Sequence, residues 1–297
     1  MKKLFVNIGL FVIPFAVYAI LVIVVDPFNY FNVSHVIPDE LKAETSCRLN
    51  YRLWKMNAYR RQPTDNILLG DSRMLLLDAD SISARTGETY YNFAYGGGSL
   101  DEVIETFWFA DSIVSLKHVY IGLNFSMFNG YHTVNRTHQV RKVFANPLLY
   151  LIDKVMIKAG AMLVAQALFD AEYEIERPEM TPKQFWEYQV AVTARNQFER
   201  YTYPDDYYQR LSEIVSYCND RGITVNIIIF PEHMDLINRY FELGLKEEYD
   251  RFKQDIHRLV KTHDFNYGNP ITENCADFTD PYHFTTDVGL QLVDEIW

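Results

Sequence analysis

The stretch Asn66-Ile67-Leu68-Leu69-Gly70-Asp71-Ser72-Arg73 decides the fold, because a short apolar run stops at a glycine and a serine follows. Runs of this kind are typical of buried strands in parallel sheets. We expect a helix to begin at Arg73. A serine between a strand and a helix projects from the carboxyl edge of the sheet, where backbone N–H groups can stabilise a developing oxyanion. The stretch therefore predicts an α/β fold with Ser72 at a functional edge.

Apolar runs also alternate with helical patterns further along the chain. Further short apolar runs lie at 90–94, 118–123 and 223–230, and they end at the glycine run 96–98, at Asn124 and at Pro231. Helical patterns cover 205–221, 246–263 and 286–296, and Ser99 with Glu102 predicts a capped helix after the glycine run. Strands that alternate with helices predict a parallel sheet covered by helices on both faces.

The third and fourth runs are too far apart for a simple connection, so we expect a helical insertion at about 128–203. Within it, 147–169 is apolar but interrupted by Asp153, Lys154 and Lys158, which argues against a second membrane span. We interpret this segment as a packed helix of a cap subdomain, with contact to a membrane surface as the alternative. The expected domains are therefore an anchor at 1–26, a connector at 27–63, and an α/β domain at 64–297 that holds the insertion.

The N-terminal run from Leu4 to Val25 has no charged residue. At about 1.5 Å per residue, a helix of this length crosses a hydrocarbon core of about 30 Å. Lys2 and Lys3 precede the run and Asp26 follows it, so the positive-inside rule places the N-terminus in the cytoplasm and the remainder outside. A cleaved signal peptide is the alternative, although the chain stays apolar beyond its small-residue candidate, Ala19.

The composition narrows the range of partners. Apolar residues make up 48% of the 297 residues, which is enough for a sizeable core. A net charge of -11 without a long basic run argues against nucleic acid as a partner. Cys47, Cys218 and Cys275 form neither a disulfide framework nor a metal cluster by spacing, although one bridge stays open. His132 and His138 lack a carboxylate at ligand spacing, so we expect no metal, and we expect no organic cofactor.

The segment Asp280-Pro281-Tyr282-His283 supplies partners for the serine. A serine hydroxyl is a weak nucleophile until an imidazole takes its proton, and the imidazole needs a carboxylate that holds its tautomer. Aspartate and histidine three residues apart can present both groups from one loop. We therefore predict that Ser72, Asp280 and His283 act together. His233 follows the fourth run and could face the same edge, or it could simply begin a helix.

Four blocks of the chain, in this order, resemble the SGNH, or GDSL-like, hydrolase superfamily. They are Gly70-Asp71-Ser72, Asn92-Phe93-Ala94-Tyr95-Gly96-Gly97, Gly122-Leu123-Asn124 and Asp280-Pro281-Tyr282-His283. The resemblance implies a flavodoxin-like three-layer α/β/α sandwich. It also implies an oxyanion hole made by the backbone N–H groups of Ser72 and Gly97 and the side-chain amide of Asn124, with Gly96 as the alternative glycine. Arg73 departs from many lipolytic members, and we interpret it as a contact for an anionic substrate or as a surface charge.

One membrane helix, an outward-facing SGNH domain and a helical insertion are together similar to the alginate O-acetyltransferase group and the lipoteichoic acid D-alanylation proteins. This similarity of organisation implies O-acyl transfer, such as acetyl transfer, to a cell-envelope glycan. A multi-span membrane acyltransferase would be the partner that supplies the acyl group. Two alternatives stay open, namely an esterase that removes acyl groups from a glycan or lipid, and a non-catalytic scaffold that binds a glycan or a partner.

Overall fold

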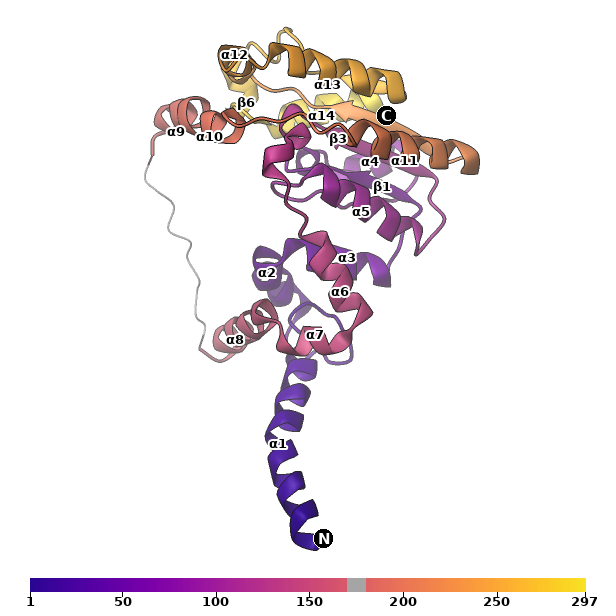
Figure 1. Ribbon diagram of the computed structural model, residues 1–297, viewed down its shortest axis with the longest axis vertical. Coiled ribbons are helices and arrows are strands. Elements are labelled where there is room, and N and C mark those ends of the chain that lie inside the picture. Colours follow the sequence, from indigo (N-terminus) through magenta and orange to yellow (C-terminus); the bar gives the residue numbers. More distant parts are fainter. Residues whose placement is uncertain (170–179) are drawn as a thin grey trace. The chain divides into compact units, whose positions relative to one another are not determined.

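The computed structural model describes residues 1–169 and 180–297, and the chain divides into two compact units (Figure 1). The first unit joins Met1–Gln62 to Arg136–Glu176, and the second joins Pro63–Asn135 to Arg177–Trp297. The expected insertion at 128–203 is therefore not one piece. Its middle belongs with the N-terminal helices, and its two ends belong with the sheet.

The second unit is built on a parallel sheet of five strands, which confirms the predicted α/β class. Its strands are β1 (Asn66–Leu69), β2 (Tyr90–Asn92), β3 (His118–Leu123), β4 (Thr224–Ile229) and β5 (Thr262–Asp264), in the order β2-β1-β3-β4-β5. All of β1 is buried, as are five of the six residues of β3 and of β4. Continuous apolar runs suit strands that are covered on both faces.

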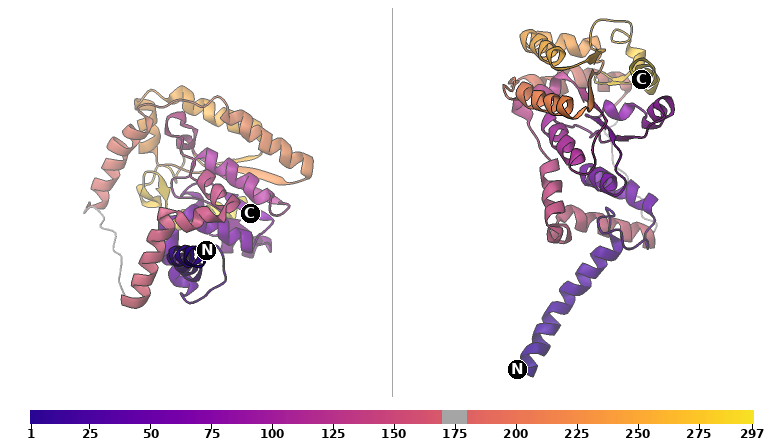
Figure 2. Two further views of the ribbon diagram at one scale, coloured as in Figure 1. Left: turned by 60° about the horizontal axis from the view of Figure 1, so that its bottom comes forward. Right: turned by 90° about the vertical axis from the view of Figure 1, so that its right-hand side faces the viewer.

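Helices of the second unit cover both faces of this sheet (Figure 2). On one face α5 (Leu100–Asp111) contacts β1 and α11 (Tyr207–Arg221) contacts β4, and α11 also contacts α13 (Lys246–Leu259). On the other face α4 (Ala79–Thr86) and α14 (Thr286–Ile296) contact each other and share a core with Leu68, Tyr120 and Ile228. The remaining elements are α9 (Pro182–Tyr188), the π-helix η4 (Gln189–Thr193), α10 (Ala194–Phe198), α12 (Met234–Glu242), the antiparallel pair β6 (Phe278–Asp280) and β7 (His283–Phe284), and the 3-10 turns η1 (Met74–Leu76), η2 (Phe125–Phe128), η3 (Gly130–His132) and η5 (Cys275–Asp277).

Two local predictions about this unit were wrong. No α-helix begins at Arg73; the turn η1 follows instead, and α4 begins only where the Asp78 carboxylate accepts the backbone N–H groups of Asp80 and Ser81. The helix expected over 246–263 ends at Leu259, and the chain then adds the edge strand β5. Ser72 is thus followed by a single turn and not by a long helix.

The first unit is entirely helical over its described residues. It contains α1 (Lys2–Val25), α2 (Asp39–Leu49), α3 (Tyr51–Arg61), α6 (Thr137–Ala145), α7 (Pro147–Ile152) and α8 (Lys154–Phe169). The expected connector is therefore a pair of helices, of which α2 packs on α8 and α3 packs on α6. Helices contributed by the insertion hold the connector in place.

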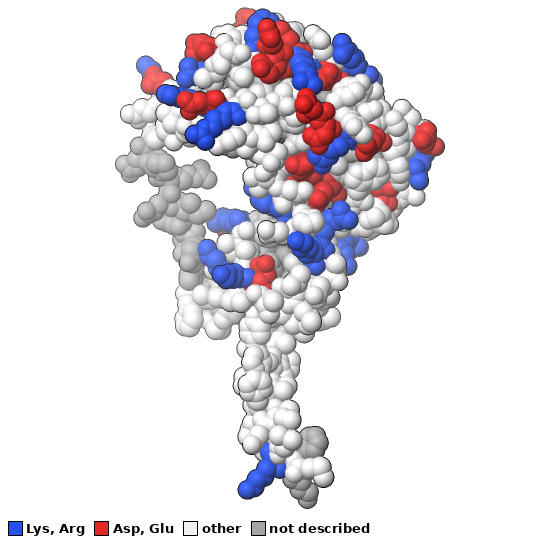
Figure 3. All heavy atoms as spheres, viewed as in Figure 1, with Lys and Arg blue, Asp and Glu red and all other residues white. Residues whose placement is uncertain are grey.

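Helix α1 is long and apolar enough to cross a membrane, and Val6–Val25 is not buried within the structure. Figure 3 shows this stem without charge between its basic N-terminal end and the body of the unit. The helix ends at Asp26, which adopts a left-handed φ of 37°. The buried Asp26 carboxylate accepts the backbone N–H groups of Tyr30, Phe31 and Asn32 and the hydroxyl of Tyr150. Four donors compensate the burial of this charge and fix the end of the stem.

Candidate active site

Ser72 lies in the loop that leaves β1, and close backbone packing fixes this loop. A Cβ atom on Gly70 would lie 3.0 Å from Met74 Cβ and 3.1 Å from the Gly122 carbonyl oxygen. A Cβ atom on Gly98 would lie 3.0 Å from the Gly70 carbonyl oxygen. A larger residue at either position would push these neighbours away by a few tenths of an ångström, so glycine suits both positions. The serine loop therefore packs directly between the end of β3 and the glycine turn that follows β2.

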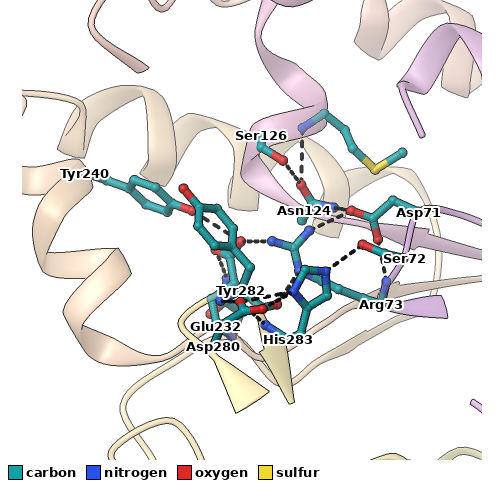
Figure 4. A network of polar contacts seen from close by, with 12 residues as sticks. Asp71, Ser72, Arg73, Asn124, Ser126, Glu232, Tyr240, Asp280, Tyr282 and His283 are labelled. Carbon is teal, nitrogen blue, oxygen red and sulfur yellow. Dashed lines mark hydrogen bonds and ion pairs between the residues drawn. The ribbon is translucent and has the colours of Figure 1, made fainter. Parts of the chain in front are cut away.

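The structure brings Ser72, His283 and Asp280 together in one line (Figure 4). Ser72 Oγ lies 2.7 Å from His283 Nε2, and His283 Nδ1 lies 2.8 Å from Asp280 Oδ2. A carboxylate can only accept, so Nδ1 carries the proton and Nε2 is free to accept from the serine hydroxyl. The His283 side chain is 33% exposed, so a reactant can reach it. These are the three residues that the sequence predicted to act together.

Asp280 is positioned by its own loop. Its Oδ1 accepts the backbone N–H groups of Tyr282 at 2.8 Å and His283 at 3.2 Å. Burial alone would raise the pKa of Asp280, but the hydrogen bond and charge of His283, the Tyr282 N–H and the charge of Arg73 outweigh burial and lower it. The carboxylate is therefore ionised at neutral pH and can hold the imidazole in the required tautomer.

Asn124 is bonded to Asp71, the residue that directly precedes Ser72. Asn124 is fully buried, and its Nδ2 donates to Asp71 Oδ2 at 2.7 Å. Its Oδ1 accepts from Ser126 Oγ and from the Met127 backbone N–H. These bonds leave the second Nδ2 hydrogen for another acceptor, since a side-chain amide has two donor hydrogens. Gly97 lies in the exposed glycine turn with a φ of 58°. The donation of Asn124 and Gly97 to an oxyanion stays a prediction.

Arg73 does not fit the predicted contact with an anionic substrate, because its side chain is only 3% exposed. Its Nη1 donates to Asp71 at 2.7 Å, its Nη2 to Glu232 at 2.6 Å, and its Nε to the Tyr282 carbonyl at 3.0 Å. Burial alone would lower the pKa of Arg73, but Asp71 and Glu232 raise it, so the guanidinium stays charged. Arg73 thus ties the serine loop to the loop that carries Asp280 and His283.

Glu232 belongs to the same network, although no motif in the sequence marks it. This carboxylate is fully buried after β4, where it also accepts from Tyr240 Oη at 3.2 Å and from Asn266 Nδ2 at 3.1 Å. The sequence signal for it is a polar residue at the end of a buried strand, next to His233. That histidine begins a helix, since its Nδ1 accepts the Asp235 backbone N–H and caps α12.

The cysteines Cys47, Cys218 and Cys275 are all free, so the disulfide that the sequence left open is not formed. His233, Asp235 and Cys275 bring possible ligand atoms within 4.8 Å of one another, which their spacing did not predict. Trp186 Nε1 already donates to the Asp235 carboxylate at 2.9 Å.

No family model matches the chain, and no curated protein matches it. A solved structure described as "a putative platelet activating factor from Streptococcus pneumonia" is similar to the chain with a TM-score of 0.40 and 9% identity, over 86% of this chain and 94% of that chain. This likeness is too remote to carry an argument about fold or function.

Proposed function

We propose that the protein is a membrane-anchored serine acyl-transfer enzyme of the SGNH type, which transfers an O-acyl group to a cell-envelope glycan. The observation that supports this proposal is the line of hydrogen bonds from Ser72 through His283 to Asp280. A non-catalytic scaffold would have no need for a buried, ionised carboxylate behind an accessible serine and histidine pair. The parallel sheet, with Ser72 after β1 and Asn124 after β3, agrees with the SGNH fold.

In the proposed reaction, Ser72 Oγ attacks the carbonyl carbon of an acyl ester while His283 Nε2 takes the hydroxyl proton. The backbone N–H groups of Ser72 and Gly97 and the Asn124 amide stabilise the oxyanion, and each such donor is typically worth about 3 kcal/mol. The imidazolium returns the proton to the leaving oxygen, which gives acyl-Ser72. An acceptor hydroxyl then loses its proton to His283 and attacks the acyl carbon. The bond between that carbon and Ser72 Oγ breaks, the imidazolium returns its proton to Oγ, and the new ester leaves.

The location of this chemistry follows from α1. Basic residues precede the apolar helix, so the positive-inside rule places the second unit outside the cytoplasm. A glycan of the envelope is accessible there, and a multi-span membrane acyltransferase could deliver the acyl group. Hydrolysis is the second candidate, because the 33% exposure of His283 lets water reach the acyl-enzyme. In that case the enzyme would remove acyl groups from a glycan or a lipid.

A transfer assay separates these outcomes. We expect the full-length protein, purified in detergent, to release nitrophenol from p-nitrophenyl acetate and to add the acetyl mass to one of a panel of envelope oligosaccharides. Mass spectrometry of the acceptors measures transfer, and absorbance measures total turnover. Nitrophenol release without a gain in acceptor mass would indicate an esterase. Turnover that does not depend on Ser72 would contradict both forms of the proposal.

The buried Arg73–Glu232 pair offers a second test. Glu232→Gln should destabilise the second unit by about 2 kcal/mol, because it replaces a charged acceptor of the buried Arg73 with a neutral one and leaves Asp71 as the remaining carboxylate partner of Arg73. Turnover should also fall, since Arg73 holds the Tyr282 carbonyl in the segment between Asp280 and His283. Urea unfolding and kcat measure the two effects. The control is Glu199→Gln, which removes an exposed pair with Arg195 and should change stability by less than about 1 kcal/mol. Equal stability of both variants would contradict a positioning role for Glu232.

A further inference from the structure

The outward face of α7 and α8 is apolar, which is unusual for a helix that faces water. The buried side of α8 carries Met156, Ala159 and Leu163. The opposite side exposes Ile157 by 47% and Leu168 by 69%. Leu148 and Ile152 of α7 are likewise exposed by 66% and 67%. Beyond Lys154 and Lys158 on its first turns, α8 is therefore apolar on both sides, and only one side packs inside the first unit.

This apolar surface is continuous with α1. The Tyr18 hydroxyl donates to the Leu151 carbonyl at the end of α7 at 2.5 Å. A Cβ atom on Gly160 would lie 3.8 Å from Val25 Cγ1. Between the two helices runs an open groove of about 520 Å³, within the about 300–1,000 Å³ typical of small-ligand sites. Its walls include Tyr18, Val22 and Val25 of α1 and Ile157, Val164 and Phe169 of α8.

The groove suits a hydrocarbon chain. Among the described residues that line it, only Tyr18 carries a side-chain oxygen or nitrogen, and the Leu151 carbonyl accepts from that hydroxyl. A peptide would find no side-chain partner there for its backbone groups, which are costly to bury unpaired. An acyl chain requires none. Because one wall is the candidate membrane span itself, the occupant must be present where that span ends.

The position of Tyr18 along α1 agrees with a groove that lies at the boundary between headgroups and acyl chains. Tyr18 lies seven residues before Val25, which is about 10 Å along a helix. Amphipathic helices lie about 5–10 Å deep in the boundary between headgroups and acyl chains. Lys154 and Lys158 are exposed on the first turns of α8, where long basic side chains can extend to lipid phosphates.

We infer that α7 and α8 lie in the membrane interface and that the groove between α1 and α8 holds the acyl chain of a phospholipid. This inference rests on the membrane anchorage proposed above, and it does not depend on the acyl-transfer chemistry. The first unit would then fix its own depth in the bilayer through three helices instead of one.

Photo-crosslinking tests the inference with the full-length protein in liposomes of phosphatidylcholine and phosphatidylglycerol. The photoreactive residue p-benzoylphenylalanine replaces Val164 in the groove or Leu168 on the exposed face, one position per protein. After irradiation, both proteins should gain the mass of one phospholipid. The matched control places the probe at Glu44 of α2, which is exposed in the same unit but polar in its surroundings. That protein should gain no lipid mass.

Phe11 of α1 is 70% exposed, and a probe there separates failure of the membrane anchor from failure of the lipid groove. Lipid adducts at Phe11 without adducts at Val164 and Leu168 would overturn the inference and leave the anchor in place. No lipid adduct at Phe11 would overturn the anchor and the inference together. Neither result depends on turnover, so a failed acyl-transfer assay would not affect this test.

Discussion

Ser72→Ala is expected to lower ester turnover by roughly 10⁴- to 10⁶-fold while the second unit stays folded. The substitution removes the only atom that the His283 Nε2 contact at 2.7 Å can activate, and no acyl-enzyme can form without it. The proposed oxyanion donors remain in this variant, so a small rate above that of the uncatalysed reaction should persist. Single-turnover kinetics with p-nitrophenyl acetate measure the loss, and mass spectrometry should detect acyl-Ser72 only in the wild type.

The matched control for this variant is Ser216→Ala, which changes an exposed serine on α11. This protein should retain the wild-type rate and melting temperature. Circular dichroism of the Ser72→Ala variant should match that of the wild type, which separates lost chemistry from lost folding. A folded Ser72→Ala protein with an undiminished rate would refute the proposed nucleophile.

The sequence predicted the central strands because their apolar runs are continuous. β1 and β3 are buried along nearly their whole length, and a run of that kind is a local signal. β5 has no such signal, since Thr262-His263-Asp264 is a polar triplet that pairs with Ile227–Ile229 of β4. Its extended conformation comes from the neighbouring strand, which no window of the sequence can show.

The first unit was harder to predict for a related reason. The buried side of α2 includes Lys42, Thr45 and Ser46, so the helix has no apolar stripe. Lys42 Nζ donates to Asn29 Oδ1 at 2.8 Å, and Thr45 donates to Gln166 Oε1 at 2.8 Å. Such burial depends on partners that only the folded chain supplies. The sequence of residues 27–63 consequently predicts only a connector.

Part of the candidate site could likewise be predicted from local sequence patterns, and part of it could not. Asp280 and His283 flank the turn of one hairpin, β6–β7, and the serine follows a strand, so their geometry could be expected from local patterns. The role of Arg73 could not, because its partner Glu232 lies 159 residues further along the chain. A charged residue beside a nucleophile has the same local sequence whether it faces a substrate or the interior. Only the fold distinguishes the two.

Asp280→Asn is expected to lower kcat/KM by about 10⁴-fold with little change in the fold. The asparagine can still accept the backbone N–H of Tyr282, so the loop should keep its shape. If its amide group faces His283 Nδ1, however, it donates a hydrogen bond, and the imidazole then carries its proton on Nε2. That tautomer points a donor at Ser72 and cannot take the hydroxyl proton.

The pH dependence of this variant provides a check that a merely structural defect would not reproduce. The lowered pKa of Asp280 keeps the wild-type carboxylate ionised across the neutral range. Its contribution to stability is therefore fully present above the ordinary aspartate pKa of 3.8 and is lost only as the pH falls through the lower, folded value. Between about pH 5 and pH 9 this carboxylate is ionised throughout, so kcat/KM of Asp280→Asn should stay far below that of the wild type across the whole interval. A variant that regained wild-type kcat/KM at any pH in that interval would show that the Asp280 carboxylate does not hold the tautomer of His283.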